Sequence, residues 1–180
     1  SLWTRSTVKI ANFFYTGFNK YINKGTSEEI EQVIFPFLGK EKYFSFFGRK
    51  GFIESQLLIP DNNLEEFFAE FKSLYKLHRP TITLFSIKNM SGEQKYLRFE
   101  NNNLCVTFDY VNNKLNRIFL NEIDKLCIKF KILPSIIKDS RLSRETFNSC
   151  YTQAEEFKDK LNNFDKERIY KSELSNRLNI

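Results

Sequence analysis

The stretch SIIKDSRLS, residues 135–143, places a lysine at the end of an apolar run, followed by an aspartate and then an arginine. Lysine head groups are strongly hydrated and seldom lie where a strand enters a core. The ammonium group of Lys138 could stabilise a negative charge on a bound ligand. The simpler interpretation is a lysine at the rim of a sheet, paired with Asp139 or another carboxylate. The residues alone leave both interpretations open.

A second group of polar side chains falls on the segment NLCVTFDY. Its strict alternation predicts an apolar face of Leu104, Val106 and Phe108 and a polar face of Asn103, Cys105, Thr107 and Asp109. Cysteine is among the most buried residue types, so Cys105 beside Asn103 suits the polar wall of a pocket, although a solvent-facing strand side is the simpler explanation. Gln56, in the middle of an apolar stretch, either lines the same pocket or is satisfied within a sheet.

The glycines do not form a phosphate-binding loop. A nucleotide cofactor normally needs a cluster of backbone N–H groups around its phosphates. Neither GxGxxG nor GxxxxGK[ST] occurs in this sequence. The glycines stand apart, at Gly17, Gly25, Gly39, Gly48, Gly51 and Gly92. We therefore expect that this chain alone does not hold a dinucleotide.

Composition argues against several other classes of site. Three cysteines without CxxC spacing and a single histidine, His78, disfavour a disulfide framework and a metal site. No apolar run reaches the roughly 18 residues that a membrane span needs. The segment Lys50–Phe52 echoes an RNA-binding pattern, but Ile53 and Glu54 stand where a small residue and a stacking aromatic are needed, so no nucleic-acid partner is predicted. The net charge of +6 permits an anionic ligand or contact with a membrane surface and demands neither.

Hydrophobic periodicity predicts the elements that position these residues. Helices are expected over 5–22, 61–78 and 113–131, and strands over 51–60, 81–87, 103–110 and 132–137. Gly25 is expected to close the first helix, and a capping box of Asn62 and Glu65 to begin the second. Leu115 and Ile118 are expected among the inward residues of the third helix.

From residue 51 the predicted order is β-α-β-β-α-β, which is an α+β, ferredoxin-like arrangement: an antiparallel sheet with two helices on one face. Residues 51–142 form this core. Residues 1–50 supply an N-terminal helix and an edge segment, extended around Pro36, and residues 143–180 form a charged helical segment in short pieces. The arrangement hosts many functions and does not by itself indicate one.

Three segments together resemble a known family. GFIESQLLIP, NNNLCVTFDY and the run from IIKDSRLS to SELSNRL occur in that order. They are similar to the C-terminal substrate-binding domain of the decaprenylphosphoryl-β-D-ribose 2-oxidase family, flavoproteins of the vanillyl-alcohol-oxidase superfamily. The resemblance spans about residues 30–178, and the KDSR block and the SxLxxRL ending are its most specific parts.

The resemblance implies roles for individual residues. Lys138 corresponds to the family lysine that reaches the flavin ring and the substrate, which implies a catalytic and cofactor-binding role. Gln56 and Asn103 correspond to amides that line the substrate pocket, and Cys105 corresponds to the pocket cysteine that covalent inhibitors attack.

Other positions are ambiguous or depart from the family pattern. Lys88 corresponds to a further pocket lysine, with Ser86 as the competing position two residues away. Four family pocket residues are replaced here: three aromatics by Ile34, Ser55 and Ser135, and an aspartate by Thr107. These changes argue for a sugar-like alcohol substrate that differs from the family's own.

The resemblance implies that the chain is the substrate-binding domain of a longer FAD-dependent oxidoreductase, which oxidises a secondary alcohol by hydride transfer to flavin. FAD would be held mainly by a domain absent from these 180 residues, and this chain alone would be inactive. The expected partners are that FAD-binding domain and a sugar-like or phospho-sugar substrate, in the cytoplasm or at a membrane surface. The alternative is a stand-alone basic ferredoxin-like module that binds an anionic partner.

Overall fold

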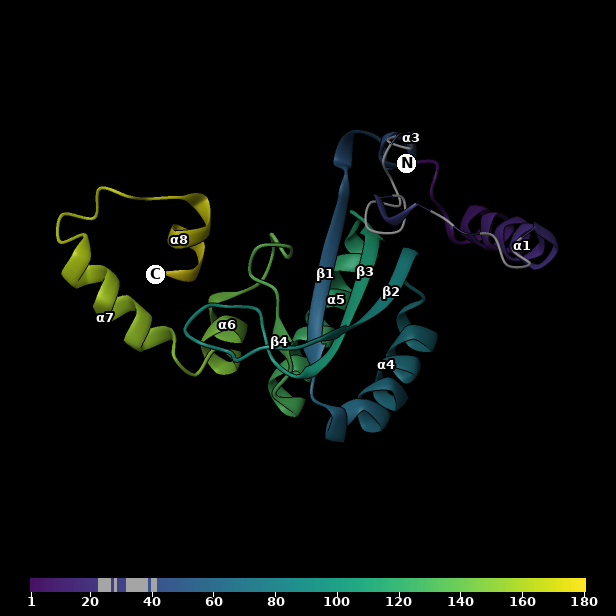
Figure 1. Cartoon of the computed structure of the whole chain (residues 1–180). Coiled ribbons are helices and arrows are strands. Elements are labelled where there is room, and N and C mark those ends of the chain that lie inside the picture. Colours follow the sequence, from purple (N-terminus) through teal and green to yellow (C-terminus); the bar gives the residue numbers. More distant parts are fainter. Residues whose placement is uncertain (23–26, 28, 32–38, 40–41) are drawn as a thin grey trace.

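The fold is built on one antiparallel sheet. The structure, a computed structural model, describes residues 1–22, 27, 29–31, 39 and 42–180. The strands are β1 (Phe52–Ile59), β2 (Ile82–Met90), β3 (Asn103–Val111) and β4 (Leu133–Pro134), in the spatial order β2-β3-β1-β4. Every neighbouring pair is antiparallel. The α+β class and the predicted βαββαβ order are both confirmed (Figure 1).

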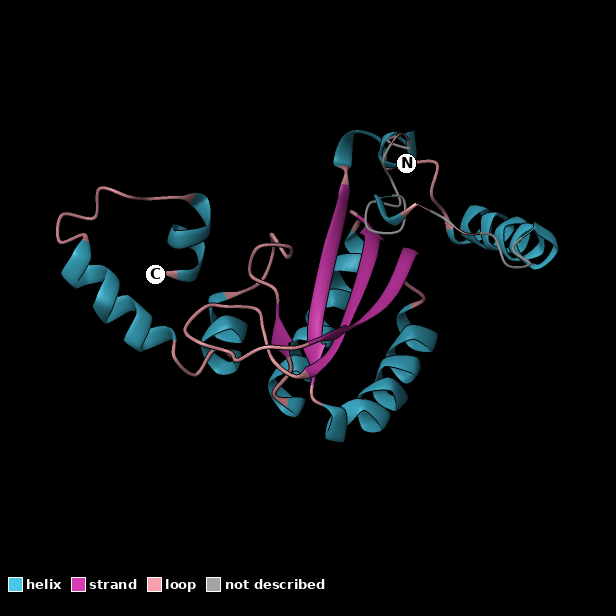
Figure 2. Cartoon of the chain, viewed as in Figure 1, coloured by secondary structure: helices cyan, strands magenta, loops and turns pink. Residues whose placement is uncertain are grey.

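Helices flank the sheet and extend from both ends of the chain (Figure 2). They are α1 (Arg5–Ile22), α3 (Lys42–Ser45), α4 (Leu64–His78), α5 (Lys114–Phe130), α6 (Arg144–Cys150), α7 (Ala154–Phe164) and α8 (Glu173–Leu178), with 3-10 turns η1 (Gly48–Lys50) and η2 (Asp61–Asn63). Within the described ranges, none of the helices has the length and apolarity needed to cross a membrane.

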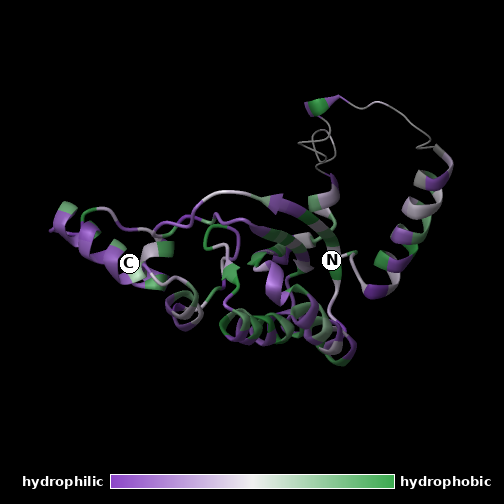
Figure 3. Ribbon diagram, turned by 60° about the horizontal axis from the view of Figure 1, so that its bottom comes forward, coloured by the Kyte–Doolittle hydropathy of each residue, from purple (hydrophilic) through white to green (hydrophobic). Residues whose placement is uncertain are grey.

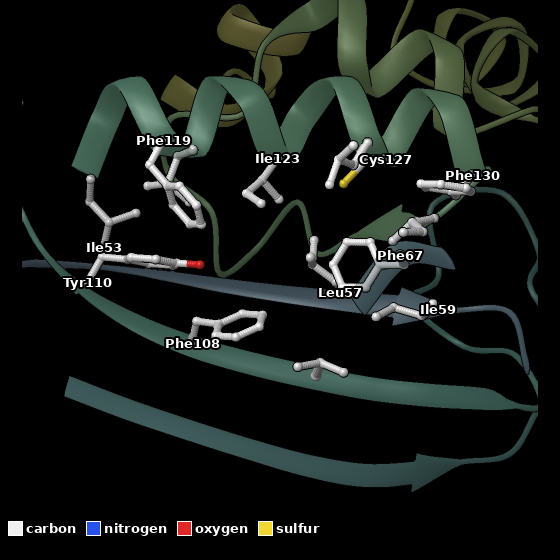
Figure 4. Close-up of a cluster of buried hydrophobic side chains, with 14 residues drawn as sticks. Ile53, Leu57, Ile59, Phe67, Phe108, Tyr110, Phe119, Ile123, Cys127 and Phe130 are labelled. Carbon is white, nitrogen blue, oxygen red and sulfur yellow. The ribbon is translucent and has the colours of Figure 1, made fainter. Parts of the chain in front are cut away.

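The main core lies between the sheet and helices α4 and α5. Figure 4 shows its side chains between α5 and the sheet. Alternate residues of β1 and β3, among them Leu57 and Phe108, point toward this side. Phe67 of α4 and Phe119 and Ile123 of α5 are buried against them. Because every second strand residue faces this core, the remaining residues of β1 and β3 face the other side of the sheet.

A second apolar cluster covers one end of that other side. Leu58 and Cys105 from the sheet pack there with Phe147 of α6 and Leu178 of α8. Residues of the long connection between β2 and β3, including Phe99, lie against the same cluster. The C-terminal helices therefore shield part of the sheet face that α4 and α5 leave uncovered.

Two local predictions about helices are wrong. Helix α4 has Asn63 as its N-cap, without a side-chain cap bond, because the 3-10 turn η2 occupies the positions where the box of Asn62 and Glu65 was expected. Leu115 and Ile118 of α5 are 63% and 40% exposed. In the first turn of α5 the buried position is taken by Asn116, whose amide bonds the backbone of the preceding strands, so Leu115 turns toward solvent.

The last predicted strand is shorter than expected. Only Leu133–Pro134 pairs with β1, and the chain then enters a turn that includes Lys138. The amide of Ser135 still donates to the Gln56 carbonyl at 2.8 Å, which extends the pairing by one bond. The predictions for Gly25, Ile34 and the extended segment around Pro36 lie outside the described residues.

Candidate functional site on the polar sheet face

The sheet carries a polar face on the side away from α4 and α5. Directly opposed residues in an antiparallel pair point to the same side of a sheet. The strand register therefore places one set of side chains together: Glu54, Gln56, Ser86, Lys88, Asn103, Cys105, Thr107 and Asp109. We call this set the polar face. All four predicted site residues that lie on strands belong to it.

The register arranges the polar face in rows across three strands. In the central row, Gln56, Thr107 and Ser86 lie opposite one another. In the next row, Cys105 lies between Leu58 and Lys88. Ser86 and Lys88, the two candidates for one family position, thus share a face because they are two residues apart on one strand.

Lys138 reaches the polar face from the turn after β4. Its Nζ lies 3.3 Å from Oε2 of Glu54, with the lysine side chain 47% exposed. The same turn is bound to β1 by the Ser135–Gln56 backbone bond. The structure therefore brings Lys138 together with the strand that carries Gln56, although the lysine lies in a turn and not at a strand end.

A buried ionic network fixes the turn that carries Lys138. Arg141 donates to both carboxylate oxygens of Asp124, at 2.6 and 2.8 Å, and to Oδ2 of Asp139 at 3.0 Å. Burial raises the pKa of Asp139, and the neighbouring Arg141 charge opposes that rise. Arg177 of α8 donates to the Leu142 carbonyl. Within the KDSR block, Asp139 and Arg141 therefore stabilise the turn, while Lys138 remains at the surface.

The contact between Tyr43 and the buried Asp109, at one end of the polar face, was not predicted from the sequence. The hydroxyl of Tyr43 donates to Oδ2 of Asp109 at 3.1 Å and lies 2.8 Å from Oγ1 of Thr83. Asp109 is 4% exposed and lies opposite Glu54 in the β1–β3 register. Burial raises the pKa of Asp109 to about 6; Tyr43 and Lys138 lower it and Glu54 raises it. The alternation of β3 placed Asp109 on this face, but nothing in the sequence connected it to Tyr43.

Cys105 lies at the border between the polar face and the second apolar cluster. It is 3% exposed and packs in that cluster, so its surroundings are less polar than expected. Burial raises the pKa of its thiol, while a hydrogen bond with Thr107 and the positive charge of Lys88 lower it. The cysteine is therefore a shielded thiol with a cation beside it.

The replaced family positions take different places in the structure. Ser55 is 2% exposed and lies opposite Phe108, on the core side of β1. Ser135 is 3% exposed, inside the turn. Thr107 lies on the polar face. The interpretation of these positions as changes in a substrate pocket stays a prediction.

The polar face is unevenly exposed: Cys105, Thr107 and Asp109 on its central strand are buried, whereas Lys88 is exposed. Two surface hollows lie beside α1 and beside η1, and neither is lined by a predicted site residue. In the part of the chain that the structure describes, no three His, Cys, Asp or Glu residues lie together as metal ligands would.

Comparison with known proteins agrees with a distant oxidase relationship. No family model matches the chain. Over 137 residues it is 26% identical to decaprenylphosphoryl-β-D-ribose oxidase of Mycolicibacterium smegmatis. The match covers 74% of this chain and only 29% of the length of that relative. The fold is thus an α+β sheet domain, and the chain is similar, distantly and in part, to an oxidase.

Proposed function

We propose that this chain is the substrate-binding domain of an FAD-dependent oxidoreductase that oxidises a secondary alcohol of a sugar-like molecule. The observation that carries the proposal is the position of Lys138, whose ammonium group lies 3.3 Å from the carboxylate of Glu54 on the polar face. The similarity to an oxidase supports the same class of reaction.

The residues of the polar face fit the reacting end of a flavin and not its phosphates. The face offers the Lys138 ammonium group and the Gln56 amide, which suit an electron-rich ring and a hydroxylated substrate. The glycines in the described ranges are dispersed over helix α1 and separate turns and build no phosphate cradle. When bound, a flavin would accept the hydride from the carbinol carbon.

The chain's own groups would bind and orient the alcohol. Lys138 would donate to the reacting oxygen and stabilise the negative charge that develops there, as a preorganised electrostatic contact. Gln56, Ser86 and Asn103 would donate to or accept from the remaining hydroxyl groups, since all three lie on the same face. Glu54 would hold the lysine in position before the substrate arrives.

The test is the rate of flavin reduction in the full-length protein carrying Lys138→Ala. Loss of one preorganised donor typically costs about 100- to 1,000-fold in turnover, and we expect a loss of that size. Lys125→Ala is the matched control, because Lys125 is also exposed and also pairs with a glutamate, Glu122. Flavin reduction by Lys138→Ala at close to the wild-type rate would contradict the proposal, whereas FAD content should remain unchanged in both variants.

A further inference from the structure

Helix α1 carries large apolar side chains that nothing in the described chain covers. It extends away from the sheet (Figures 1 and 3). Its exposed large side chains are Ile10 at 56%, Phe13 at 76%, Phe14 at 68%, Tyr15 at 70%, Phe18 at 68% and Tyr21 at 84%. Contiguous exposure of this kind marks a surface that binds something.

The start of α1 is attached to the rest of the fold. The Trp3 ring packs against Tyr43, Phe46 and Phe47, and the Leu2 amide donates to the Phe46 carbonyl. Thr4 and Thr7 exchange hydrogen bonds that begin the helix. The helix is therefore held at its N-terminal end, while its length projects into solvent.

The two sides of α1 differ sharply in chemistry. At 3.6 residues per turn, Ile10, Phe14, Phe18 and Tyr21 line one side of the helix. Its basic residues, Arg5, Lys9 and Lys20, lie on the other side, and Phe13 and Tyr15 lie at the two borders between these sides. No acidic residue occurs anywhere in α1.

We propose that α1 is an interfacial helix that binds the surface of an anionic lipid bilayer. A helix with a basic polar side and a side rich in aromatic residues lies in the plane of a membrane interface, with its apolar side among the acyl chains. Lysine and arginine next to that side are attracted by anionic headgroups. Tyrosine rings favour the same boundary, where one end is apolar and the other is wet.

The charge pattern favours lipid over a protein partner. All three ionic side chains of α1 are positive, which matches a uniformly anionic surface. Protein interfaces commonly pair charges of both signs, and α1 offers no carboxylate for a partner's cations. This inference is independent of the flavin chemistry proposed above.

The test is flotation of the full-length protein with vesicles of equal parts phosphatidylcholine and phosphatidylglycerol. We expect binding that weakens as salt is raised and that is at least about tenfold weaker with pure phosphatidylcholine, because the attraction is partly electrostatic. Phe14→Ser/Phe18→Ser should abolish binding. Lys9→Glu/Lys20→Glu should reduce it about tenfold or more, because each substitution reverses a charge near the lipid.

Matched controls lie elsewhere on the surface. Phe164→Ser/Ile169→Ser removes two side chains that are 82% and 71% exposed, and should leave binding unchanged. Lys72→Glu/Lys76→Glu makes the same charge change on α4 and should have little effect. Absence of binding to the mixed vesicles at low salt would overturn the proposal. Vesicle binding that survives the α1 substitutions would also overturn it. A third contradicting result is a protein that does not bind vesicles but forms a dimer, if Phe14→Ser/Phe18→Ser dissociates that dimer.

Discussion

The ammonium group of Lys138 lies 3.3 Å from the carboxylate of Glu54, and Glu54 lies directly opposite Asp109 on the neighbouring strand. Two carboxylates at opposed positions of a sheet repel each other. A lysine from a separate turn offsets that repulsion at one end of the polar face. Lys138 therefore forms an ion pair with Glu54, and its positive charge also lowers the pKa of Asp109.

The Lys138–Glu54 pair should contribute little to stability. Lys138 is about half exposed, and ion pairs in such settings are worth about 0.2–1 kcal/mol because water and salt screen them. A double-mutant cycle of Lys138→Ala and Glu54→Gln, measured by urea unfolding of the chain, should give a coupling energy in this range. A coupling of several kcal/mol would show that the pair is structural.

Asp109 should make stability fall as pH rises. Its folded pKa of about 6 lies above the unfolded value of about 4, so the folded state holds the proton more tightly. Its stabilising contribution is therefore present below about pH 4 and is lost by about pH 6, a change of about 3 kcal/mol at 1.36 kcal/mol per pKa unit.

Asp109→Asn should remove that part of the pH dependence. From pH 4 to pH 6 the wild type should lose unfolding free energy relative to the variant, and above pH 6 the difference should level off. Asp61→Asn, an exposed aspartate at the start of η2, is the control and should follow the wild-type curve. Parallel curves for Asp109→Asn and wild type would contradict the elevated pKa.

Arg141→Ala should be strongly destabilising. The substitution leaves Asp139, whose side chain is 1% exposed, and Asp124, at 13%, without their cation. Removing one partner of a buried pair typically costs about 3–5 kcal/mol. Arg144→Ala, which changes an exposed arginine three residues away, should cost far less in the same urea titration. Similar losses for the two variants would mean that the network is not structural.

The three thiols should differ in reactivity. Cys127 is fully buried and its pKa is raised well above the ordinary value, so it should be alkylated last. Cys105 should react before it, because Lys88 partly offsets the rise in its pKa. Lys88→Ala should therefore slow the alkylation of Cys105 and leave the alkylation rate of Cys150 unchanged. Mass-mapped alkylation over time measures all three, and labelling of Cys127 as fast as Cys105 would contradict this order.

Local patterns predicted the elements that carry clear periodicity. β3 alternates strictly, so both its position and the residues on its two faces follow from sequence. The run from Ile132 to Ile137 has no alternation and contains Pro134, so no local pattern separates the two-residue strand from the turn that follows.

Contacts between residues that are far apart in the chain could not be predicted from the sequence. Tyr43 and Asp109 are 66 positions apart, and a single polar pair leaves no periodic trace. The pairing of Lys138 with Glu54, 84 positions away, likewise depends on the path of the chain. For α1, periodicity predicted the helix and its apolar side but not that this side would remain uncovered.

The turn that carries Lys138 is held by residues that are remote in the chain. The amide of Ser135 donates to the carbonyl of Gln56 on β1, and Arg177 of α8 donates to the Leu142 carbonyl. The turn is therefore tied to a central strand at one end and to the last helix at the other. Without α8, the turn would keep only the Ser135–Gln56 bond and the Arg141 contacts with Asp124 and Asp139, so the C-terminal residues help to position Lys138 without touching the polar face.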